Sequence, residues 1–299
     1  MNIVLTIRDK IPVKKYGGTE RVVAWLADAL VKKGHSVFIA APQGSTSPCA
    51  EIIEIKPRRS LYFPLPAGID IVHNHTLPAF RVNAPSLVTF HWIVKPDFVF
   101  PPNTIFLSRM HAAMYESTKF VYNGLDPSEY LFNDQKDDYL LFMSRVSRSS
   151  KGVDKAIALA KRMGFKLIIA GGYTFTLNRK IRSVGMVGGR KKAELIANAR
   201  ALLFPISWGE PFGLIMIEAL VSGTPVIATP CGAVPEIVTP DVGFLCAGLP
   251  EMEQAVERIN EISPHACRRR VMEHFTSEKM AENYLKVYGQ VIEKGKLAD

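Results

Sequence analysis

The sequence predicts an α/β protein built from doubly wound parallel sheets. Short apolar runs suited to buried strands alternate with amphipathic segments, and one β-α-β unit can be placed in full, with strands over 201–206 and 225–229 flanking a helix over 212–221. Pro211 precedes this helix, and Ser222-Gly223 ends it. At 299 residues, 47% of them hydrophobic, the chain is long enough for one large or two ordinary domains.

The first half of the chain is predicted to hold a series of strands. An amphipathic helix over 19–33 follows the opening strand and is closed by Gly34, and a short helical stretch is expected over 109–116. Strands are expected over 2–7, 36–40, 51–55, 69–73, 86–90, 103–107 and 119–121. A hinge near 123–127 and a polar linker over 133–138 come next, so a second domain is expected to begin near 138.

The second half repeats the alternation of strand and helix. Strands are expected over 139–143, 165–170, 183–187 and 242–246, besides the two in the β-α-β unit. Helices are expected over 153–163 and 191–199, and three more begin near 251, 264 and 277.

Two acids mark the complete β-α-β unit, Glu210 in its loop and Glu218 in its helix. The loop that follows a strand of a doubly wound sheet is where ligands bind. Eight helical residues rise roughly 12 Å, whereas paired glycosidase carboxylates lie only ~5 to 9.5 Å apart. We therefore expect the two acids to hold different parts of one long ligand, as a nucleotide sugar would require.

Backbone N–H groups at the start of this helix offer a place for an anion between the two acids. The groups are those of Phe212, Gly213 and Leu214, which have no partner within a helix. Two simpler interpretations stay open. Glu210 could be a solvated loop acid, and Glu218, which interrupts an apolar run, could make a hydrogen bond inside the core.

Other βα turns carry glycines or cations. Arg145 and Lys151 bracket the turn after the strand 139–143, an arrangement suited to a nucleotide diphosphate, although a solvated basic loop is the alternative. Gly17 and Gly18 precede the first helix, and Gly171-Gly172 end the strand 165–170, where missing side chains would let a ligand approach the backbone. None of these turns has the G-x-G-x-x-G fingerprint, which argues against a nicotinamide dehydrogenase.

Composition and charge exclude several classes of protein. No apolar run of 18 residues is free of charge, and 2–7 is too short for a signal sequence, so a cytoplasmic protein is expected. Four scattered cysteines without C-x-x-C spacing argue against a zinc site. The net charge of +9 includes the clusters 14–15, 32–33, 58–59 and 268–270. We expect these basic residues to be solvated surface charges. Peripheral contact with the inner membrane face, or with a polyanionic acceptor, is the less favoured interpretation. No nucleic acid is expected as partner, since neither a nucleic-acid-binding module nor interleaved aromatics along a basic face are present.

The residues of the central unit resemble glycosyltransferase family 4, the retaining, nucleotide-sugar-dependent enzymes with the GT-B fold. The family's E-x7-E motif, the Phe-Gly after its first acid and the following A-x-x-x-G-x-P-V-[IV]-A pattern stand here as Glu210, Glu218, Phe212-Gly213, Ala219, Gly223 and 225–228. Further matches are the Gly-Gly of 17–18, the D-[IV]-[IV]-H-x-H of 70–75, the T-x-H ending at His91, the N-G-[VL]-D of 123–126 and the R-x5-K-G of 145–152. The resemblance covers essentially the whole chain and is most specific over 145–238.

The resemblance implies a role for each candidate residue. Arg145 and Lys151 would bind the diphosphate, Glu210 the hydroxyls of the donor sugar, and Glu218 the ribose. Gly17-Gly18 would approach the phosphate or the sugar, and His91 would point at the sugar. Gly188 lies in the turn where this family meets the base, and Gly171 ends the neighbouring strand. His91, Arg145, Lys151 and Glu210 are thus the expected catalytic residues.

The same resemblance implies a GT-B architecture, in which two Rossmann-like domains face a central cleft. We expect an acceptor-side domain over 1–130, a nucleotide-sugar domain over 131–276, and a C-terminal helix over 277–299 that crosses back to the first domain. The first domain is shorter than is usual for the family, which leaves the acceptor open: a saccharide, a lipid-linked molecule or a small molecule.

The expected function is that of a retaining glycosyltransferase of hexosyltransferase type that transfers sugar from a nucleoside-diphosphate sugar by a front-face route. No cofactor is expected, and no metal, because no D-x-D motif is set to hold one. Two alternatives remain. One is a sugar-nucleotide epimerase or hydrolase of the same architecture; the other is a non-catalytic partner protein that binds nucleotides.

Overall fold

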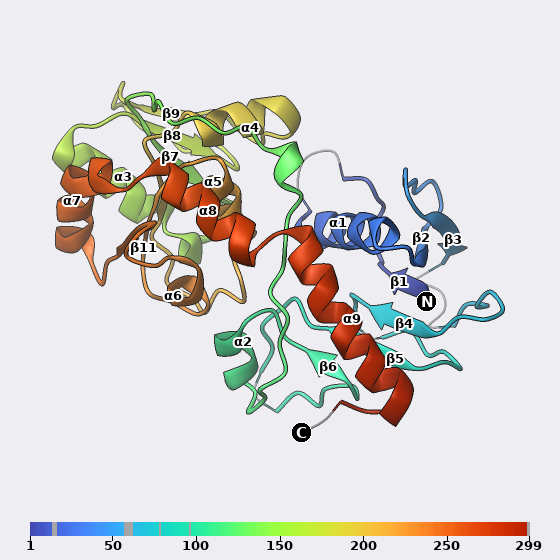
Figure 1. Ribbon diagram of the computed structural model, residues 1–299. Helices are drawn as coiled ribbons and strands as arrows, with labels where there is room; N and C mark the ends of the chain where they lie inside the picture. The colour runs from blue at the N-terminus through green and yellow to red at the C-terminus, as the bar shows by residue number, and fades with distance from the viewer. Residues whose placement is uncertain (14–16, 57–61, 78, 96, 298–299) are drawn as a thin grey trace. The chain divides into compact units, whose positions relative to one another are not determined.

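The chain divides into two compact units, which are described separately (Figure 1). The computed structural model describes residues 1–13, 17–56, 62–77, 79–95 and 97–297, so the doublets 14–15 and 58–59 lie outside the described residues. Of these residues, unit 1 contains 1–126 and 276–297, and unit 2 contains 127–275. The boundaries expected from the sequence, after residues 130 and 276, lie close to these.

Unit 1 is built on a six-stranded sheet. Its strands are β1 (Asn2–Thr6), β2 (Ser36–Pro42), β3 (Glu51–Ile55), β4 (Ile71–Asn74), β5 (Ser86–Thr89) and β6 (Thr104–Ile105). All neighbours pair in parallel, in the order β3-β2-β1-β4-β5-β6. The winding direction therefore reverses between β1 and β4, and the carboxyl ends of these two strands form the switch point of this sheet.

Three described helices accompany this sheet: α1 (Gly18–Lys32), α2 (Arg109–Ala113) and α9 (Ser277–Lys294). Helix α9 packs against α1 although the two are distant in sequence (Figure 1). The strand expected over 119–121 is wrong, because this segment forms only an isolated bridge between Phe106 and Phe120. Since β6 itself is two residues long, the sheet ends there.

Unit 2 repeats the same strand order. Its strands are β7 (Leu140–Met143), β8 (Leu167–Ala170), β9 (Ile181–Ser183), β10 (Ala201–Phe204), β11 (Val226–Ala228) and β12 (Gly243–Leu245). They are all parallel, in the order β12-β11-β10-β7-β8-β9, which puts the switch point between β7 and β10. The expected doubly wound fold is confirmed. The strand expected over 183–187 lies earlier, because Gly185 takes a positive φ that ends an extended run.

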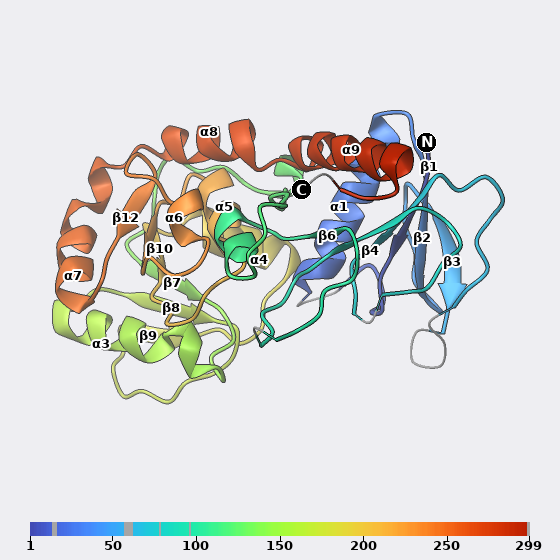
Figure 2. The same cartoon turned by 90° about the horizontal axis from the view of Figure 1, so that it is seen from below.

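Helices cover both faces of the second sheet (Figure 2). They are α3 (Val153–Met163), α4 (Gly189–Ala197), α5 (Leu214–Val221), α6 (Val234–Ile237), α7 (Leu249–Arg258) and α8 (Pro264–His274), with 3-10 turns at Pro127–Glu129, Ser149–Lys151 and Ile259–Glu261. Helix α5 packs against α8, and α3 packs against α7. The short helix α6 was not expected from the sequence.

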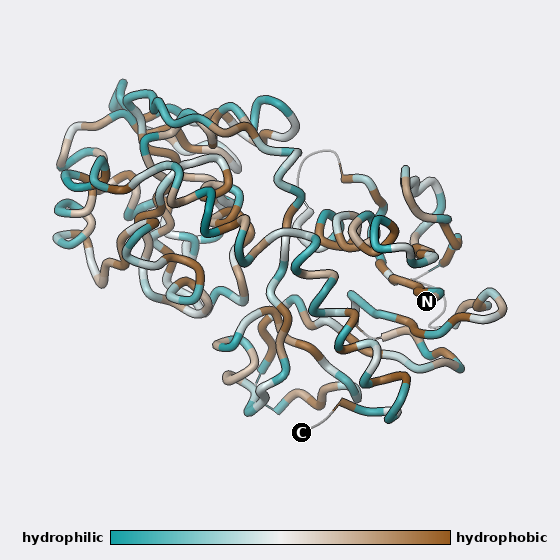
Figure 3. Tube along the Cα trace, viewed as in Figure 1, coloured by the Kyte–Doolittle hydropathy of each residue, from teal (hydrophilic) through white to brown (hydrophobic). Residues whose placement is uncertain are grey.

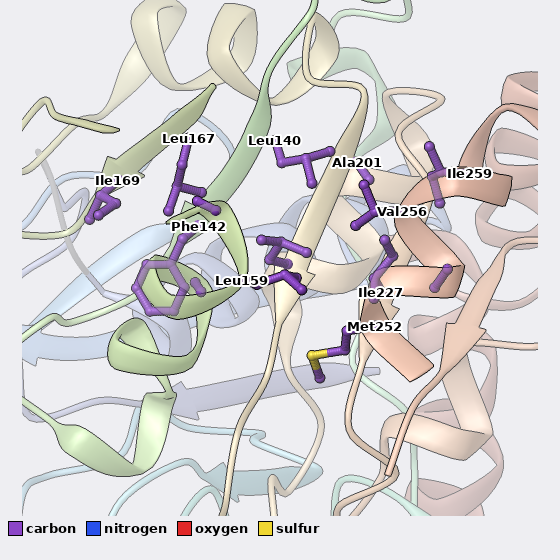
Figure 4. Close-up of a cluster of buried hydrophobic side chains, with 14 of the residues drawn as sticks. Leu140, Phe142, Leu159, Leu167, Ile169, Ala201, Ile227, Met252, Val256 and Ile259 are labelled. Atoms are coloured by element: carbon purple, nitrogen blue, oxygen red, sulfur yellow. The ribbon is translucent and has the colours of Figure 1, made fainter. Parts of the chain in front are cut away.

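The core of unit 2 explains why the strands read as uninterrupted apolar runs. On one face, Leu140, Leu167 and Ile227 from the strands meet Leu159 of α3 and Val256 of α7, and all are buried (Figure 4). A strand of a parallel sheet is covered on both faces, so it has no polar alternation. Hydrophobic residues accordingly lie inside each unit, and the outer turns are mostly hydrophilic (Figure 3).

Candidate active site

Two loops meet at the switch point of the second sheet. The loop after β7 runs over 144–152, and the loop after β10 runs over 205–213. The Ser207 N–H donates to the carbonyl of Ser150 at 2.9 Å. Gly152 has φ +80°, and a Cβ there would lie 2.1 Å from the carbonyl oxygen of Pro205. Glycine is therefore required for the two loops to stay in contact.

Lys151 and Glu210 form an ion pair across these two loops. The Lys151 Nζ lies 2.7 Å from Glu210 Oε2, and each side chain is 12% exposed. The ammonium also lies 4.2 Å from the centre of the Trp208 ring, a cation–π contact that adds to its attraction for this position. The sequence predicted that both residues belong to one site, and the structure brings them into direct contact.

Trp208 was not among the expected site residues. Its ring supports the Lys151 ammonium, and its indole Nε1 is buried without a hydrogen-bond partner in the described part of the chain. A buried N–H without an acceptor costs free energy. The signal in the sequence was its position, two residues before Glu210 in the loop that follows β10.

The backbone of Glu210 is fixed by a glycine far along the chain. Gly232 has φ +60°, and a Cβ there would lie 2.4 Å from both the nitrogen and the oxygen of Glu210. The N–H of Ala233 donates to the same Glu210 carbonyl at 2.9 Å. Gly232 thus positions the acid, a role that sequence reasoning missed because Cys231-Gly232 alone looks like an ordinary turn.

Glu218 occupies a separate, buried polar cluster. It is 1% exposed and accepts hydrogen bonds from the Tyr130 hydroxyl at 2.9 Å and from Lys192 Nζ at 2.7 Å. Lys192 also lies 2.6 Å from its second carboxylate oxygen. Glu218 therefore makes hydrogen bonds inside the protein, as one of the interpretations left open by the sequence required. A ribose hydroxyl would have to join or displace these partners. Neither Tyr130 nor Lys192 was expected.

Arg145 lies half-buried in the loop after β7, beside the glycines that end β8. Gly171 has φ +112°, and a Cβ there would lie 2.0 Å from the carbonyl oxygen of Ser144. A Cβ on Gly172 would likewise lie 2.3 Å from the side chain of Val146. The space beside Gly171 is thus filled by the loop that carries Arg145, rather than left for a ligand as the sequence interpretation supposed.

The remaining candidates of unit 2 lie at helix starts. Gly213 is the N-cap of α5 with φ +85°, so the N–H groups of Gly213 and Leu214 lie at the first turn. The Phe212 side chain is buried and meets Phe275 edge-on with ring centres 5.8 Å apart, so that only its backbone could serve a ligand. Gly188 is the extended N-cap of α4.

In unit 1, Gly17 and Gly18 open α1 just after the central strand β1. Gly17 is the N-cap, and a Cβ there would lie 2.7 Å from Oε2 of Glu20. Burial raises the pKa of Glu20 above its ordinary value. Gly17 therefore makes room for this acid.

His91 follows β5 and is half-buried, next to two fully buried histidines, His73 and His75. Its Nε2 lies 3.0 Å from Nδ1 of His75, and the rings of His75 and His73 are tilted by 34° with centres 4.0 Å apart. His73 in turn contacts Tyr288 of α9 at 2.8 Å and Thr89 at 2.6 Å. Loss of solvation lowers the pKa of His91 to about 3 and that of His75 and His73 well below their ordinary value. All three rings are neutral at neutral pH.

The hydrogen bond between His75 and His91 has room for one proton, and the burial of His75 indicates which ring carries it. His75 Nε2 is buried and has no hydrogen-bond partner in the described ranges. An orphaned buried N–H is rarer than an under-satisfied acceptor, so Nε2 is the bare nitrogen and Nδ1 donates to His91. His91 then accepts at Nε2 and carries its own proton on Nδ1.

The site residues fall into three groups. Lys151 and Glu210 touch each other, Glu218 lies apart with Lys192 and Tyr130, and Gly17, Gly18 and His91 belong to unit 1. Among the described residues, no group of three or more His, Cys, Asp or Glu is arranged to hold a metal ion. No helix in these same residues combines the length and apolar character needed to span a bilayer.

Known proteins share this architecture. A solved glycosyltransferase involved in avilamycin A biosynthesis, AviGT4, superposes with a TM-score of 0.81 at 26% identity, over 98% of both chains. The Anabaena protein Alr3699/HepE, solved with UDP and glucose, gives a TM-score of 0.71 at 17% identity, over 97% of this chain and all of that one. These likenesses agree with the GT-B fold expected from the sequence.

Curated relatives match this chain over very different lengths, from 33% of it for MMP alpha-(1->4)-mannosyltransferase of Mycolicibacterium hassiacum to 93% for O-antigen chain mannosyltransferase C of Escherichia coli at 22% identity. N-acetyl-alpha-D-glucosaminyl L-malate synthase of Bacillus anthracis is 33% identical over 115 residues, which is 35% of this chain and 29% of that protein. Six further curated relatives are matched over 26% to 49% of their length. The family model described as "Glycosyl transferases group 1" matches residues 128–276. Through these residues the chain belongs to the glycosyl transferases group 1 family.

Proposed function

We propose that the chain is a retaining glycosyltransferase that takes a hexosyl group from a nucleoside-diphosphate sugar. The observation that supports this best is the 2.7 Å contact between Lys151 and Glu210 at the switch point of the second sheet. It joins a cation suited to phosphate and a carboxylate suited to sugar hydroxyls. A ligand that uses both groups must carry its sugar directly on its phosphate, as a nucleotide sugar does.

Binding requires Lys151 to change partner. In the structure its charge is balanced by Glu210. When the diphosphate arrives, the ammonium would turn to the phosphate oxygens and release the carboxylate to accept hydrogen bonds from the sugar. Arg145, in the same loop, would supply the second positive charge. The ion pair thus keeps both side chains in place until the ligand separates them.

The transfer itself uses the leaving group. The bond between the anomeric carbon and the diphosphate oxygen breaks, the acceptor oxygen bonds to that carbon on the same face, and the acceptor proton goes to the departing diphosphate. Lys151 and Arg145 stabilise the negative charge that develops there. No metal ion is required, because these two cations neutralise the diphosphate. Turnover should persist in chelator, and loss in chelator that manganese or magnesium restores would contradict this.

The other candidate residues hold the rest of the ligand. The N–H groups of Gly213 and Leu214 would bind a phosphate oxygen at the start of α5. Glu218 would accept from a ribose hydroxyl while keeping Lys192, and Gly188 would lie at the base. In unit 1, the Nδ1–H of His91 is a neutral donor suited to a sugar oxygen, and Gly17-Gly18 would let the donor approach α1. The acceptor is a saccharide, a lipid-linked molecule or a small molecule.

The test is a panel of nucleotides and nucleotide sugars in a thermal-shift assay, followed by product analysis. A ligand at 100 times its Kd stabilises the fold by about 2.7 kcal/mol. With the best donor and an acceptor screen, NMR should show free nucleoside diphosphate and a glycoside that keeps the anomeric configuration of the donor. An epimerised nucleotide sugar, free sugar alone or an inverted product would each overturn the proposal, as would binding without any turnover.

A further inference from the structure

The connection between β8 and β9 lacks the helix that the other crossovers of unit 2 possess. Residues 171–180 link the two parallel strands directly, whereas α3, α4, α5 and α6 each lie between consecutive strands (Figure 1). Parallel strands are usually joined through a helix. We call residues 171–180 the β8–β9 loop. It runs beside β9, which is an edge strand.

Three large apolar side chains of this loop project into solvent. Tyr173 is 77% exposed, Phe175 90% and Leu177 87%. The residues between them, Thr174 and Thr176, are less exposed, so the apolar side chains form one row. The Thr174 N–H donates to the Ser183 hydroxyl at 3.2 Å, and the two hydroxyl groups share a hydrogen bond at 3.1 Å. These bonds fix the backbone of the loop at Thr174, so the apolar side chains on either side of it point into solvent.

Positive charge surrounds this row in the sequence. Residues 155–193 contain ten Lys or Arg and no Asp or Glu, whereas the rest of the chain contains 27 basic and 28 acidic residues. The net charge of +9 thus originates in this one segment. Arg179 and Arg182 are both exposed, and neither forms an ion pair within the described parts of the chain. Lys180 lies between them and donates to the carbonyl of Gly164 at 2.6 Å.

We propose that the β8–β9 loop docks on an anionic phospholipid membrane, with Tyr173, Phe175 and Leu177 inserted at the interface and Arg179 and Arg182 at the lipid phosphates. A projecting row of apolar side chains lacks the concave shape of a protein-binding groove. It suits a fluid interface that supplies hydrocarbon and negative charge together. The long basic side chains can reach the headgroups while their stems cover apolar surface. The loop begins at Gly171, but none of the five side chains of this surface belongs to the candidate active site.

The first experiment measures partition onto vesicles. The full chain should co-sediment with vesicles of phosphatidylcholine containing phosphatidylglycerol and should not do so with phosphatidylcholine alone. A cation near such a surface contributes about fivefold in partition, so R179Q/R182Q should weaken binding on the order of 30-fold. Replacing all three apolar residues by serine should weaken it at least tenfold. Nucleotide thermal shifts should be unchanged in both variants, which shows that they are folded.

A matched control is offered by a loop of unit 1 that also has a strongly exposed apolar residue. Val99 in unit 1 is 88% exposed, close to the 90% of Phe175. The emission of F175W should shift to the blue on anionic vesicles, and that of V99W should not. The proposal is overturned if the protein ignores anionic vesicles, if neutral vesicles bind it equally, or if V99W shifts and F175W does not. Unchanged vesicle binding by the serine variant would show that the apolar side chains do not insert, and would equally overturn the proposal.

Discussion

The two sheets have the same strand order but carry different chemistry at the carboxyl ends of their strands. In unit 2 the loops after β7 and β10 present a cation and an acid in contact, Lys151 and Glu210. In unit 1 the ends of β4 and β5 present neutral rings, with His91 bonded to His75. Strand topology therefore fixes where a ligand site can form, and the loop residues decide which charges it can receive.

The difference suits two halves of one reaction. A diphosphate leaving group needs fixed positive charge, which unit 2 supplies on short loops held by Gly152 and Gly232. Under the proposed function, sugar hydroxyls need hydrogen bonds without net charge, which the neutral ring of His91 would supply. The predictions below test whether the two units differ in this way, beginning with the largest expected effect.

The first prediction concerns acid. Burial lowers the pKa of His73, His75, His91 and His111 in the fold, whereas the unfolded chain protonates them near pH 6.5. Their contribution to stability is present above pH 6.5 and is lost as the pH falls below it, by about 1.4 kcal/mol per pH unit for each histidine. Amide exchange, corrected for its intrinsic rate, should show sheet 1 losing protection between pH 7 and 5.

Sheet 2 is the internal control for this experiment. The histidines of unit 2, His265 and His274, have exposed side chains. Its strands should therefore keep their protection over the same interval. Equal losses in both sheets, or no loss in sheet 1, would show that the buried histidines do not distinguish the units.

The second prediction concerns the buried cluster of unit 2. Glu218→Ala removes a carboxylate that is 1% exposed and leaves Lys192 without its acid. Breaking a buried ion pair costs roughly 3–5 kcal/mol, so denaturant unfolding should show a loss of that size. Glu218→Gln/Lys192→Met, which removes both charges, should recover part of it. A loss below ~1 kcal/mol for Glu218→Ala would mean that the cluster serves a ligand alone.

The third prediction concerns the phosphate cation. Lys151→Met should reduce turnover with the best donor about 10²–10³-fold, the effect of deleting one group that stabilises developing negative charge. Arg148→Met is the matched control, because Arg148 lies three residues away in the same basic loop, is exposed, and is outside the R-x5-K-G pattern. Similar losses of turnover in the two variants would show that the loop acts only as a general basic surface.

The fourth prediction concerns the tautomer of His91, and the expected energetic effect is the smallest of the four. With histidine labelled by ¹⁵N, His91 should show a protonated Nδ1 and a bare Nε2, because His75 donates to the latter. His75→Phe should remove the preference of His91 for the tautomer protonated at Nδ1. His75→Asn should keep this preference, because the amide can still donate. A protonated Nε2 on His91 in the unaltered protein would reverse the assignment.

Much of the fold could be predicted because buried parallel strands are apolar throughout and the turns carry glycine or proline. The errors fall where that signal is weak. Segment 119–121 has the composition of a strand but forms only a bridge, and the four residues of α6 are too few to show helical periodicity.

The contact of Lys151 with Glu210 could be anticipated, since both follow strands that adjoin the switch point. The supporting residues could not. Gly232 acts on Glu210, and Lys192 and Tyr130 act on Glu218, through contacts between segments far apart in sequence that no local spacing encodes.

The most direct test of the central claim is a calorimetric titration of nucleoside diphosphate onto Glu210→Gln, with initial rates measured on the matching nucleotide sugar. If Glu210 holds the sugar and merely balances Lys151 before binding, the variant should bind the diphosphate as tightly as the unaltered protein, or more tightly, because the cation no longer has to leave an acid. Turnover should nevertheless fall at least 10²-fold, since the sugar loses its orienting group. Weaker diphosphate binding with turnover preserved would contradict this assignment.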